Sequence, residues 1–198
     1  MAYKYIAFYK PYNVLSQFTR EAPGQECLAD YLEIEEKDIY PIGRLDKDSE
    51  GLLLLTNDKK FHAKVASPSA LKKKIYWVQV DGDIDPASVS RLANGIQIKL
   101  PNGELYRTKA CTVRKIAEPS LPERNPPVRF RANIPTSWIE MHLTEGKNRQ
   151  IRKMCATVGF PVLRLVRYAV QQINIKGLKP GKHLQLSKQA FEEQLFGA

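Results

Sequence analysis

The chain has 198 residues, 43% of them hydrophobic and 26% charged, which is typical of a folded globule and long enough for one domain or two closely joined subdomains. Its 31 Lys and Arg residues outnumber its 21 Asp and Glu residues and give a formal net charge of +10, so we expect a polyanionic partner, with nucleic acid as the first candidate. No apolar run approaches the roughly 20 residues of a membrane-spanning helix, and the N-terminus lacks a signal peptide's apolar segment; we therefore expect a cytoplasmic protein that has no membrane partner.

The first third of the sequence contains two strand patterns and two helix patterns. Residues 3–9 are rich in aromatic and aliphatic side chains and predict a strand, which Pro11 ends because proline has no N–H to donate. Residues 26–34 have apolar side chains at helical spacing and predict a short amphipathic helix. The four leucines at 52–55 are bounded by turn residues and predict a strand that is buried on both faces. Asp58 then predicts the N-cap of another helix.

The middle of the chain predicts a strand, a helix and a hairpin. Residues 74–80 predict a strand with Tyr76 and Val78 on the same face. Asp85 followed by proline predicts a helix start, with an N-cap and a proline at the first helical position. Pro-Asn-Gly at 101–103 lies between alternating segments and predicts a tight turn.

The composition changes over residues 114–136, which contain five prolines and several arginines and lysines. The prolines rule out regular structure through most of this segment. Because it contains cations but few glycines or serines, we favour a semi-rigid surface arm that touches a partner. The alternative is an inert insertion.

The last third predicts short strands around one basic helix. Residues 149–158 predict a helix that ends at Gly159. Arg149, Arg152 and Lys153 are neighbours on this helix at spacings of three and four residues. Short strands with few short helices, several of them in hairpin order, predict an α+β fold with a mixed, mostly antiparallel sheet.

A dense polar loop precedes the four leucines at 52–55, an arrangement that holds side chains over a rigid floor. Asp46 in this loop is a candidate general base, nucleophile or, together with Asp48 and Glu50, metal ligand. A carboxylate that is held by an arginine stays ionised, which suits a nucleophile. On this pattern alone, however, a solvated turn before a core strand explains the loop better.

The three cysteines and three histidines are scattered along the chain, without the spacing of metal ligands or of a disulfide framework. No Ser-His-Asp set, glycine-rich phosphate loop or dinucleotide-binding fingerprint is present in the sequence. We therefore expect reduced cysteines and no metal site.

Four segments carry recognisable motifs in a fixed order along the chain. They are Lys10-Pro11, GRLDKDSEGLLLLTND at 43–58, KIYWVQV at 74–80 and EGKNRQIRKM at 145–154. Together they resemble the motifs of the RsuA-type pseudouridine synthases, and the resemblance spans nearly the whole chain. Three further segments narrow the resemblance to members that act on 23S (large-subunit) rRNA; these are residues 124–127, 134–138 and 163–168.

The resemblance implies an RNA pseudouridine synthase that isomerises a specific uridine of 23S rRNA after extruding it from the RNA. Asp46 would be the nucleophile that cleaves the bond between base and ribose. Tyr76 would stack on the flipped uridine, and Arg152 would pair with Asp46. No metal or cofactor would be needed.

The resemblance also implies one catalytic domain over residues 1–198, without the S4 domain of most relatives. It would have two abutting subdomains and a central cleft, with approximate boundaries at residues 1–70 plus the C-terminal end, and 71–170. The basic residues expected to contact RNA are Arg44, Lys74, Arg149, Lys153, Arg129 and Arg131. The expected partner is 23S rRNA or a large-subunit assembly intermediate, bound by a monomer. The alternatives are a non-catalytic rRNA-binding or ribosome-assembly factor on the same fold, and a hydrolase that uses Asp46 with a bound metal.

Overall fold

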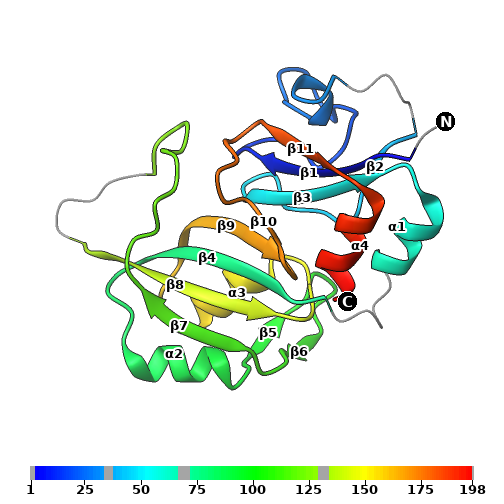
Figure 1. Ribbon diagram of the computed structural model, residues 1–198. Coiled ribbons are helices and arrows are strands. Elements are labelled where there is room, and N and C mark those ends of the chain that lie inside the picture. The colour runs from blue at the N-terminus through cyan, green and yellow to red at the C-terminus, as the bar shows by residue number, and fades with distance from the viewer. Residues whose placement is uncertain (1–2, 34–37, 67–71, 129–133, 198) are drawn as a thin grey trace. The chain divides into compact units, whose positions relative to one another are not determined.

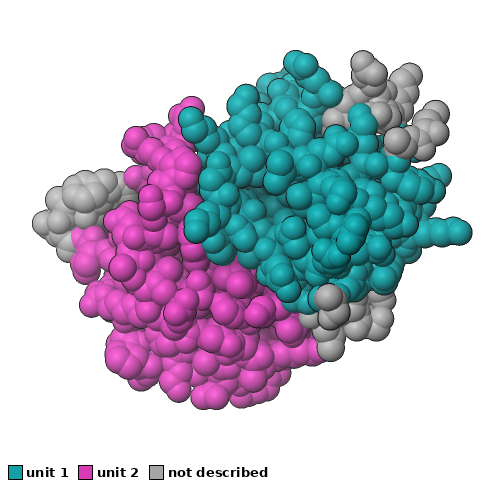
Figure 2. All heavy atoms as spheres, in the orientation of Figure 1, with its two compact units in different colours: residues 1–72, 166–198 teal, residues 73–165 magenta. Residues whose placement is uncertain are grey.

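The computed structural model (Figure 1) describes residues 3–33, 38–66, 72–128 and 134–197. Its fold is α+β, as predicted. The chain divides into two compact units (Figure 2): unit 1 contains residues 1–72 and 166–198, and unit 2 contains residues 73–165. Within the described residues, no helix is both long and apolar enough to cross a membrane.

Unit 1 is built on a sheet whose strands come from both ends of the chain. They are β1 (Tyr5–Lys10), β2 (Tyr40–Pro41), β3 (Glu50–Thr56), β10 (Ile173–Asn174), β11 (His183–Leu186) and the C-terminal half of β9 (Val162–Val170). The order is β11-β1-β3-β9, with β2 paired to β3 and β10 to β9. These pairs are antiparallel except β3 and β9, which are parallel and pair through Glu50 and Val166. A parallel pair requires a long crossover, and the crossover here contains unit 2.

Strand β3 lies between β1 and β9 and is buried along its whole length. Its leucines at 52–55 are each no more than 2% exposed, which confirms the predicted strand. Leu53 and Leu55 pack with Phe8 of β1 and with the short 3-10 helix η1 (Leu28–Asp30). Each buried leucine contributes roughly 1.5–3 kcal/mol of transfer free energy. The strand is therefore firmly packed and gives the preceding loop a fixed attachment point.

Two helices cover the other face of this sheet, α1 (Lys59–Ala66) and α4 (Lys188–Phe196). Tyr5 on β1 contacts Phe61 of α1 and Phe191 of α4, with ring centroids 5.4 Å away in both cases. Asp58 caps α1 as predicted, because its carboxylate accepts from the backbone N–H of Phe61 at 3.0 Å. The same carboxylate accepts from the Tyr5 hydroxyl at 2.8 Å.

The helix predicted over residues 26–34 is wrong in extent. In the described part of that stretch only η1 is helical. The Asp30 carboxylate accepts from the backbone N–H of Cys27 at 2.8 Å and pairs with Arg20. A short polar side chain that bonds to nearby backbone in this way competes with a continuing helix.

Unit 2 packs two helices and a hairpin against a sheet. Its complete elements are β4 (Lys74–Asp81), α2 (Pro86–Ala93), β5 (Gln97–Lys99), β6 (Leu105–Arg107), β7 (Thr112–Ile116), β8 (Thr136–Leu143) and α3 (Gln150–Thr157). Strand β8 pairs antiparallel with β4 and β7, and β5 with β6 forms the predicted hairpin. Val78, Ile139, Leu92 and Met154 join the sheet, α2 and α3 in a core where each is fully buried. Asp85 caps α2 as predicted, accepting from the Ser88 N–H at 2.8 Å.

The proline-rich arm is shorter than predicted, because β7 continues to Ile116 and β8 begins at Thr136. Its described parts, residues 117–128 and 134–135, are irregular. Arg124 donates to the backbone carbonyls of Pro126 at 2.8 Å, Pro127 at 2.9 Å and Leu163 at 3.3 Å.

The buried Arg164 donates in the opposite direction, to the carbonyl of Pro122 at 2.8 Å. The two arginines therefore fix the arm to β9. The Arg124 guanidinium therefore forms hydrogen bonds with the arm's own backbone, at Pro126 and Pro127.

Candidate active site

Asp46 lies in unit 1, in a tight turn directly before β3. Its carbonyl accepts from the Ser49 N–H at 3.0 Å, which closes the turn. The chain reaches this turn through Gly43, whose φ of +75° favours glycine. The buried Ser16 holds the residue before Asp46 twice, because its hydroxyl donates to the Leu45 carbonyl at 2.8 Å and accepts from the Leu45 N–H at 3.1 Å.

Lys10 also fixes this turn, through a hydrogen bond to its backbone at Lys47. It is fully buried, and its ammonium group donates to the carbonyls of Val14 at 2.7 Å, Pro11 at 2.9 Å and Lys47 at 3.3 Å. Three carbonyl acceptors match the three donors of a lysine.

The pKa of Lys10 reflects its position. Burial lowers this pKa to about 7, and the nearby carboxylates of Glu50, Asp48 and Asp46 oppose that shift. One buried cation thus lies within the field of all three carboxylates of the loop.

Arg167 on β9 is a second buried cation at this turn. Its Nε donates to the Leu52 carbonyl at 2.7 Å, and its Nη1 lies 3.5 Å from the Arg44 carbonyl oxygen. The arginine reaches this position because β3 and β9 approach each other very closely at Gly51. A Cβ on Gly51 would lie 2.3 Å from the Arg167 carbonyl oxygen.

The carboxylates of the loop differ in exposure. Asp46 and Asp48 are half-buried, whereas Glu50 is 2% exposed. Arg44 is exposed, and its guanidinium lies 3.4 Å from the side-chain oxygen of Gln17. Among the described residues, no three His, Cys, Asp or Glu side chains are grouped as metal ligands would be. Asp46 is thus accessible on a loop whose backbone is fixed by Ser16, Lys10 and Arg167.

Tyr76 lies in unit 2, on β4 opposite Met141 of β8. It is half-buried and packs against the core that contains Val78 and Met141. Trp77 points to the other face, where its Nε1 donates to the Glu140 carboxylate at 3.0 Å. The predicted face of the strand is therefore confirmed, and Tyr76 belongs to the wall of the core while part of its surface stays accessible.

The basic segment at the start of α3 is organised by Glu145 and Gln150. Glu145 accepts from the Tyr106 hydroxyl at 2.6 Å, from the Lys109 N–H at 2.9 Å and from the Gln150 amide at 2.7 Å. Gln150 in turn accepts from the Lys147 N–H at 2.9 Å.

These hydrogen bonds set the charge of Glu145. Burial by itself raises the pKa of this carboxyl, but the bonds from Tyr106, Lys109 and Gln150 outweigh it and hold the pKa below its usual value. Glu145 is therefore a fixed anion at neutral pH, beneath a loop that displays cations.

The predicted RNA-contacting side chains of unit 2 lie on α3, at its N-cap and on β4. Arg149 is exposed and adopts a left-handed conformation, with φ of +50°, at the N-cap of α3. Arg152 and Lys153 on α3 and Lys74 on β4 are half-buried. The predicted contacts Arg129 and Arg131 lie outside the described residues.

The predicted catalytic residues come from both units, Asp46 from unit 1 and Tyr76 with Arg152 from unit 2. Their roles and the pairing of Asp46 with Arg152 stay predictions. Sequence reasoning assigned no role to Lys10, Arg167, Glu145 or Gln150, which hold the two loops. A signal existed for all four, since each lies inside a segment that carries the resemblance, but the contacts of their side chains could not be predicted from the sequence.

A model of the RNA pseudouridylate synthase family matches residues 4–157 of this chain. The chain belongs to the RNA pseudouridylate synthase family. This confirms the family predicted from the motifs, and with it the prediction of an isomerase.

Proteins that are named ribosomal large subunit pseudouridine synthases are similar in sequence to this chain over most of its length. The chain is 49% identical over 185 residues to ribosomal large subunit pseudouridine synthase E of Vibrio parahaemolyticus serotype O3:K6, covering 92% of this chain and 74% of that protein. It is 43% identical over 175 residues to the protein of the same name from Xanthomonas campestris pv. campestris, covering 87% and 90%. It is 33% identical over 183 residues to ribosomal large subunit pseudouridine synthase B of Bacillus subtilis, covering 92% and 68%.

Solved structures of pseudouridylate synthases share the fold. One crystal structure of a pseudouridylate synthase superposes with a TM-score of 0.79 at 20% identity and covers 98% of this chain and 74% of that one. The human RNA pseudouridylate synthase domain containing 1 gives a TM-score of 0.57 at 13% identity, covering 97% and 82%. The predicted fold class is confirmed.

Proposed function

We propose that this protein isomerises one specific uridine of large-subunit (23S) rRNA to pseudouridine. The observation that carries the proposal is the 49% identity over 185 residues to a ribosomal large subunit pseudouridine synthase E. The formal net charge of +10 suits an RNA substrate. The partner is 23S rRNA, free or in a large-subunit assembly intermediate, and the protein acts as a monomer in the cytoplasm.

In the proposed reaction the uridine is first extruded from the RNA, because its glycosidic bond is out of reach inside a stacked helix. Asp46 acts as the nucleophile while the bond between N1 of uracil and C1′ of ribose breaks. The uracil turns, C5 bonds to C1′ as the bond from C1′ to the Asp46 carboxylate breaks, the proton on C5 leaves and N1 takes up a proton. The product has the same atoms as the substrate, so neither oxidant nor co-substrate is required.

Two features of the described residues support these roles. The backbone around Asp46 is fixed by hydrogen bonds at Arg44, Leu45 and Lys47, and a fixed nucleophile needs little reorganisation. Tyr76 has accessible ring surface, on which the flipped base stacks. In the proposed reaction Arg152 has the role of pairing with Asp46, which would favour the ionised carboxylate.

The remaining cations contact the RNA backbone. They are Arg44 in unit 1, Lys74, Arg149 and Lys153 in unit 2, and Arg129 and Arg131 in the arm. Contacts of this kind release counterions, so RNA affinity falls steeply as salt rises. No metal or cofactor takes part in this scheme.

The test is release of tritium from rRNA that carries C5-labelled uridine. Wild type is expected to release tritium, and Asp46→Asn is expected to lose at least about 1,000-fold in rate, because a carboxamide is not a nucleophile. Asp48→Asn is the matched control, since it removes a carboxylate from the same turn, and it should retain most activity.

The outcomes separate the alternatives. No release by wild type would indicate a non-catalytic rRNA-binding or assembly factor. Equal release by Asp46→Asn and wild type would remove Asp46 as the nucleophile. Hydrolysis of the RNA without tritium release, abolished by a chelator, would favour a metal-dependent hydrolase.

A further inference from the structure

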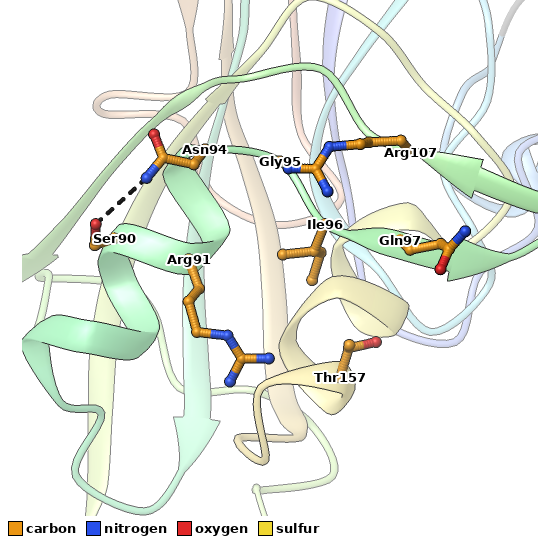
Figure 3. Close-up of a pocket in the computed structure, with 8 residues that line it drawn as sticks. All are labelled: Ser90, Arg91, Asn94, Gly95, Ile96, Gln97, Arg107 and Thr157. Atoms are coloured by element: carbon orange, nitrogen blue, oxygen red, sulfur yellow. Dashed lines mark hydrogen bonds between the residues drawn. The ribbon is translucent and has the colours of Figure 1, made fainter.

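Unit 2 has a polar pocket of about 500 Å³ that the proposed reaction does not use. It is lined by Ser90, Arg91, Asn94, Gly95, Ile96, Gln97, Arg107 and Thr157 (Figure 3). Arg91 reaches it from the last turn of α2 and Arg107 from the end of β6, and in Figure 3 their guanidinium groups lie on either side of Ile96. No carboxylate is among the lining residues.

The floor of this pocket is rigid. Gly95 has φ of +75°, and a Cβ there would lie 2.2 Å from the Thr108 carbonyl oxygen, so the backbone that enters the β5–β6 hairpin lies very close to the backbone that leaves it. The buried Thr108 accepts from the Ile96 N–H through its hydroxyl at 2.9 Å and donates its own N–H to the Ile96 carbonyl at 2.9 Å. Arg107, the neighbour of Thr108, is thereby held at a fixed place on the rim.

Both arginines are available for a ligand. Among the described residues, neither guanidinium takes part in a hydrogen bond or an ion pair, and both side chains are exposed. Nor are they needed to satisfy the helix end beside them. The Ala93 carbonyl accepts from the Cys111 N–H at 2.9 Å, and the Ser90 carbonyl accepts from the Asn94 N–H at 3.0 Å.

The chemistry of the lining selects a polyanion. Pockets for small organic ligands are mostly apolar, whereas this one offers two guanidinium groups with amide and hydroxyl side chains around them. Arginine binds phosphate through two parallel hydrogen bonds. Two unpaired arginines on one open pocket therefore suit the successive phosphates of a nucleic-acid strand.

The position of the pocket connects it to the basic segment of α3. Thr157, at the end of α3, lines the pocket, and Arg152 and Lys153 lie on the same helix. Thr157 is five positions after Arg152, which is about 7.5 Å along the helix axis. The Thr157 hydroxyl also donates to the Lys153 carbonyl at 2.8 Å. One helix thus carries cations in its first half and has two further cations beside its end.

We propose that the pocket between α2, the β5–β6 hairpin and the end of α3 binds phosphodiester groups of the substrate RNA through Arg91 and Arg107. The inference rests on the proposed function and extends it. The RNA strand continues along α3 beyond the flipped uridine, and the protein holds it there by its backbone. Affinity for rRNA then depends on this pocket, and the nucleotides that occupy it are outside the reacting site.

The experiment compares two double variants that remove the same number of charges. Arg91→Gln with Arg107→Gln empties the pocket of cations. Lys176→Gln with Lys179→Gln is the control, because the side chains of these lysines are exposed in unit 1 and make no hydrogen bond or ion pair within the described residues. Affinity for a large-subunit rRNA fragment is measured over a range of salt concentrations, and tritium release gives KM and kcat.

We expect the pocket variant to bind rRNA about 10-fold to 100-fold more weakly at low salt, with a salt slope smaller by about 1.4 to 1.8, since each lost phosphate contact removes about 0.7 to 0.9. Its KM should rise more than its kcat falls. Each single variant should show about half of this decrease in slope. The control variant should stay within about twofold, as expected for charges that touch no phosphate.

Other results would overturn the proposal. Equal affinity and equal salt slope in the two double variants would exclude a phosphate contact at the pocket. Thermal protection of wild type by inorganic phosphate, together with unchanged RNA affinity of the pocket variant, would assign the pocket to a free anion. Because binding is measured separately from catalysis, a wild-type protein without tritium release would disprove the proposed reaction and leave the pocket result standing. Thermal unfolding of each variant checks that it is folded.

Discussion

The loop of Asp46 in unit 1 and the loop before α3 in unit 2 are held in opposite ways. Beneath the first, which displays carboxylates, lie two buried cations, Lys10 and Arg167, that donate to backbone carbonyls. Beneath the second, which displays arginines and lysines, lies the anion of Glu145, which accepts from a backbone N–H and from two side chains. Each unit thus places beneath its loop a charge of the opposite sign to the one it displays.

The comparison shows how a protein can display charge on a rigid loop. A buried charge is costly unless hydrogen bonds satisfy it. Lys10 and Glu145 each have three partners, so each is satisfied, and each partner is a point at which the loop is held. The neighbouring opposite charge also attracts the displayed side chains. Rigidity and charge therefore come from the same residue in each unit, the fully buried Lys10 in unit 1 and the half-buried Glu145 in unit 2.

The largest loss of stability is expected from Gly51→Ala, which disrupts the close approach of β3 and β9 beneath the Asp46 loop. The new Cβ would lie 2.3 Å from the Arg167 carbonyl oxygen, at a φ of +105°, so β9 must move and take Arg167 with it. We expect a loss of about 3–5 kcal/mol in the free energy of unfolding, measured by urea denaturation. Gly43→Ala is the control, because it has φ of +75° but no atom within 4 Å of the new Cβ, and it should cost only about 1–2 kcal/mol. Equal losses in the two variants would show that the close approach does not matter.

Lys10→Met should have the next largest effect, since it removes the cation and retains the volume. The carbonyls of Pro11, Val14 and Lys47 lose their donor, and we expect about 3 kcal/mol of destabilisation. The rate of tritium release should fall as well, because the turn of Asp46 loosens. Lys60→Met on α1 is the control, as Lys60 is exposed. Unchanged stability and activity in Lys10→Met would contradict the role of the buried cation.

The smallest effect is expected from Glu145→Gln, which retains acceptor capacity but removes the charge. We expect a loss of about 1.5 kcal/mol at neutral pH, with exposed Glu104→Gln as the control. The pKa of Glu145 is lowered in the folded protein from an ordinary value of 4.5, so its contribution is fully present above that value and is lost as pH falls through the folded pKa. Thermal unfolding of wild type and variant should therefore converge in acid. A difference that stayed constant from neutral pH into acid would mean that the charge of Glu145 does not stabilise this loop.

The sequence predicted the parts of this fold that depend on local pattern. The four leucines at 52–55, the caps at Asp58 and Asp85 and the face of Tyr76 all follow from spacing and residue type. Four motifs in order were enough to recognise the family, and they placed the candidate site on Asp46.

The supports of the two loops could not be predicted. Charged residues are rarely fully buried, so nothing in the sequence indicated that Lys10 and Arg167 lie beneath a loop. The partners of Glu145, Tyr106 and Lys109, lie 39 and 36 positions away along the chain. Long-range contacts of this kind arise only when the hairpin and α3 come together in the folded unit.

The path of β9 has a consequence for how the protein is made. Unit 2 is one continuous segment, residues 73–165, whereas unit 1 is completed by residues 166–198. During synthesis, β1 and β3 emerge early and must wait for the strands that flank them, β9 and β11. Unit 2 can therefore fold while the first 72 residues remain an unfinished sheet with open edges. Since open strand edges invite pairing with other chains, the nascent protein is most prone to aggregation in the interval before residues 166–198 are translated.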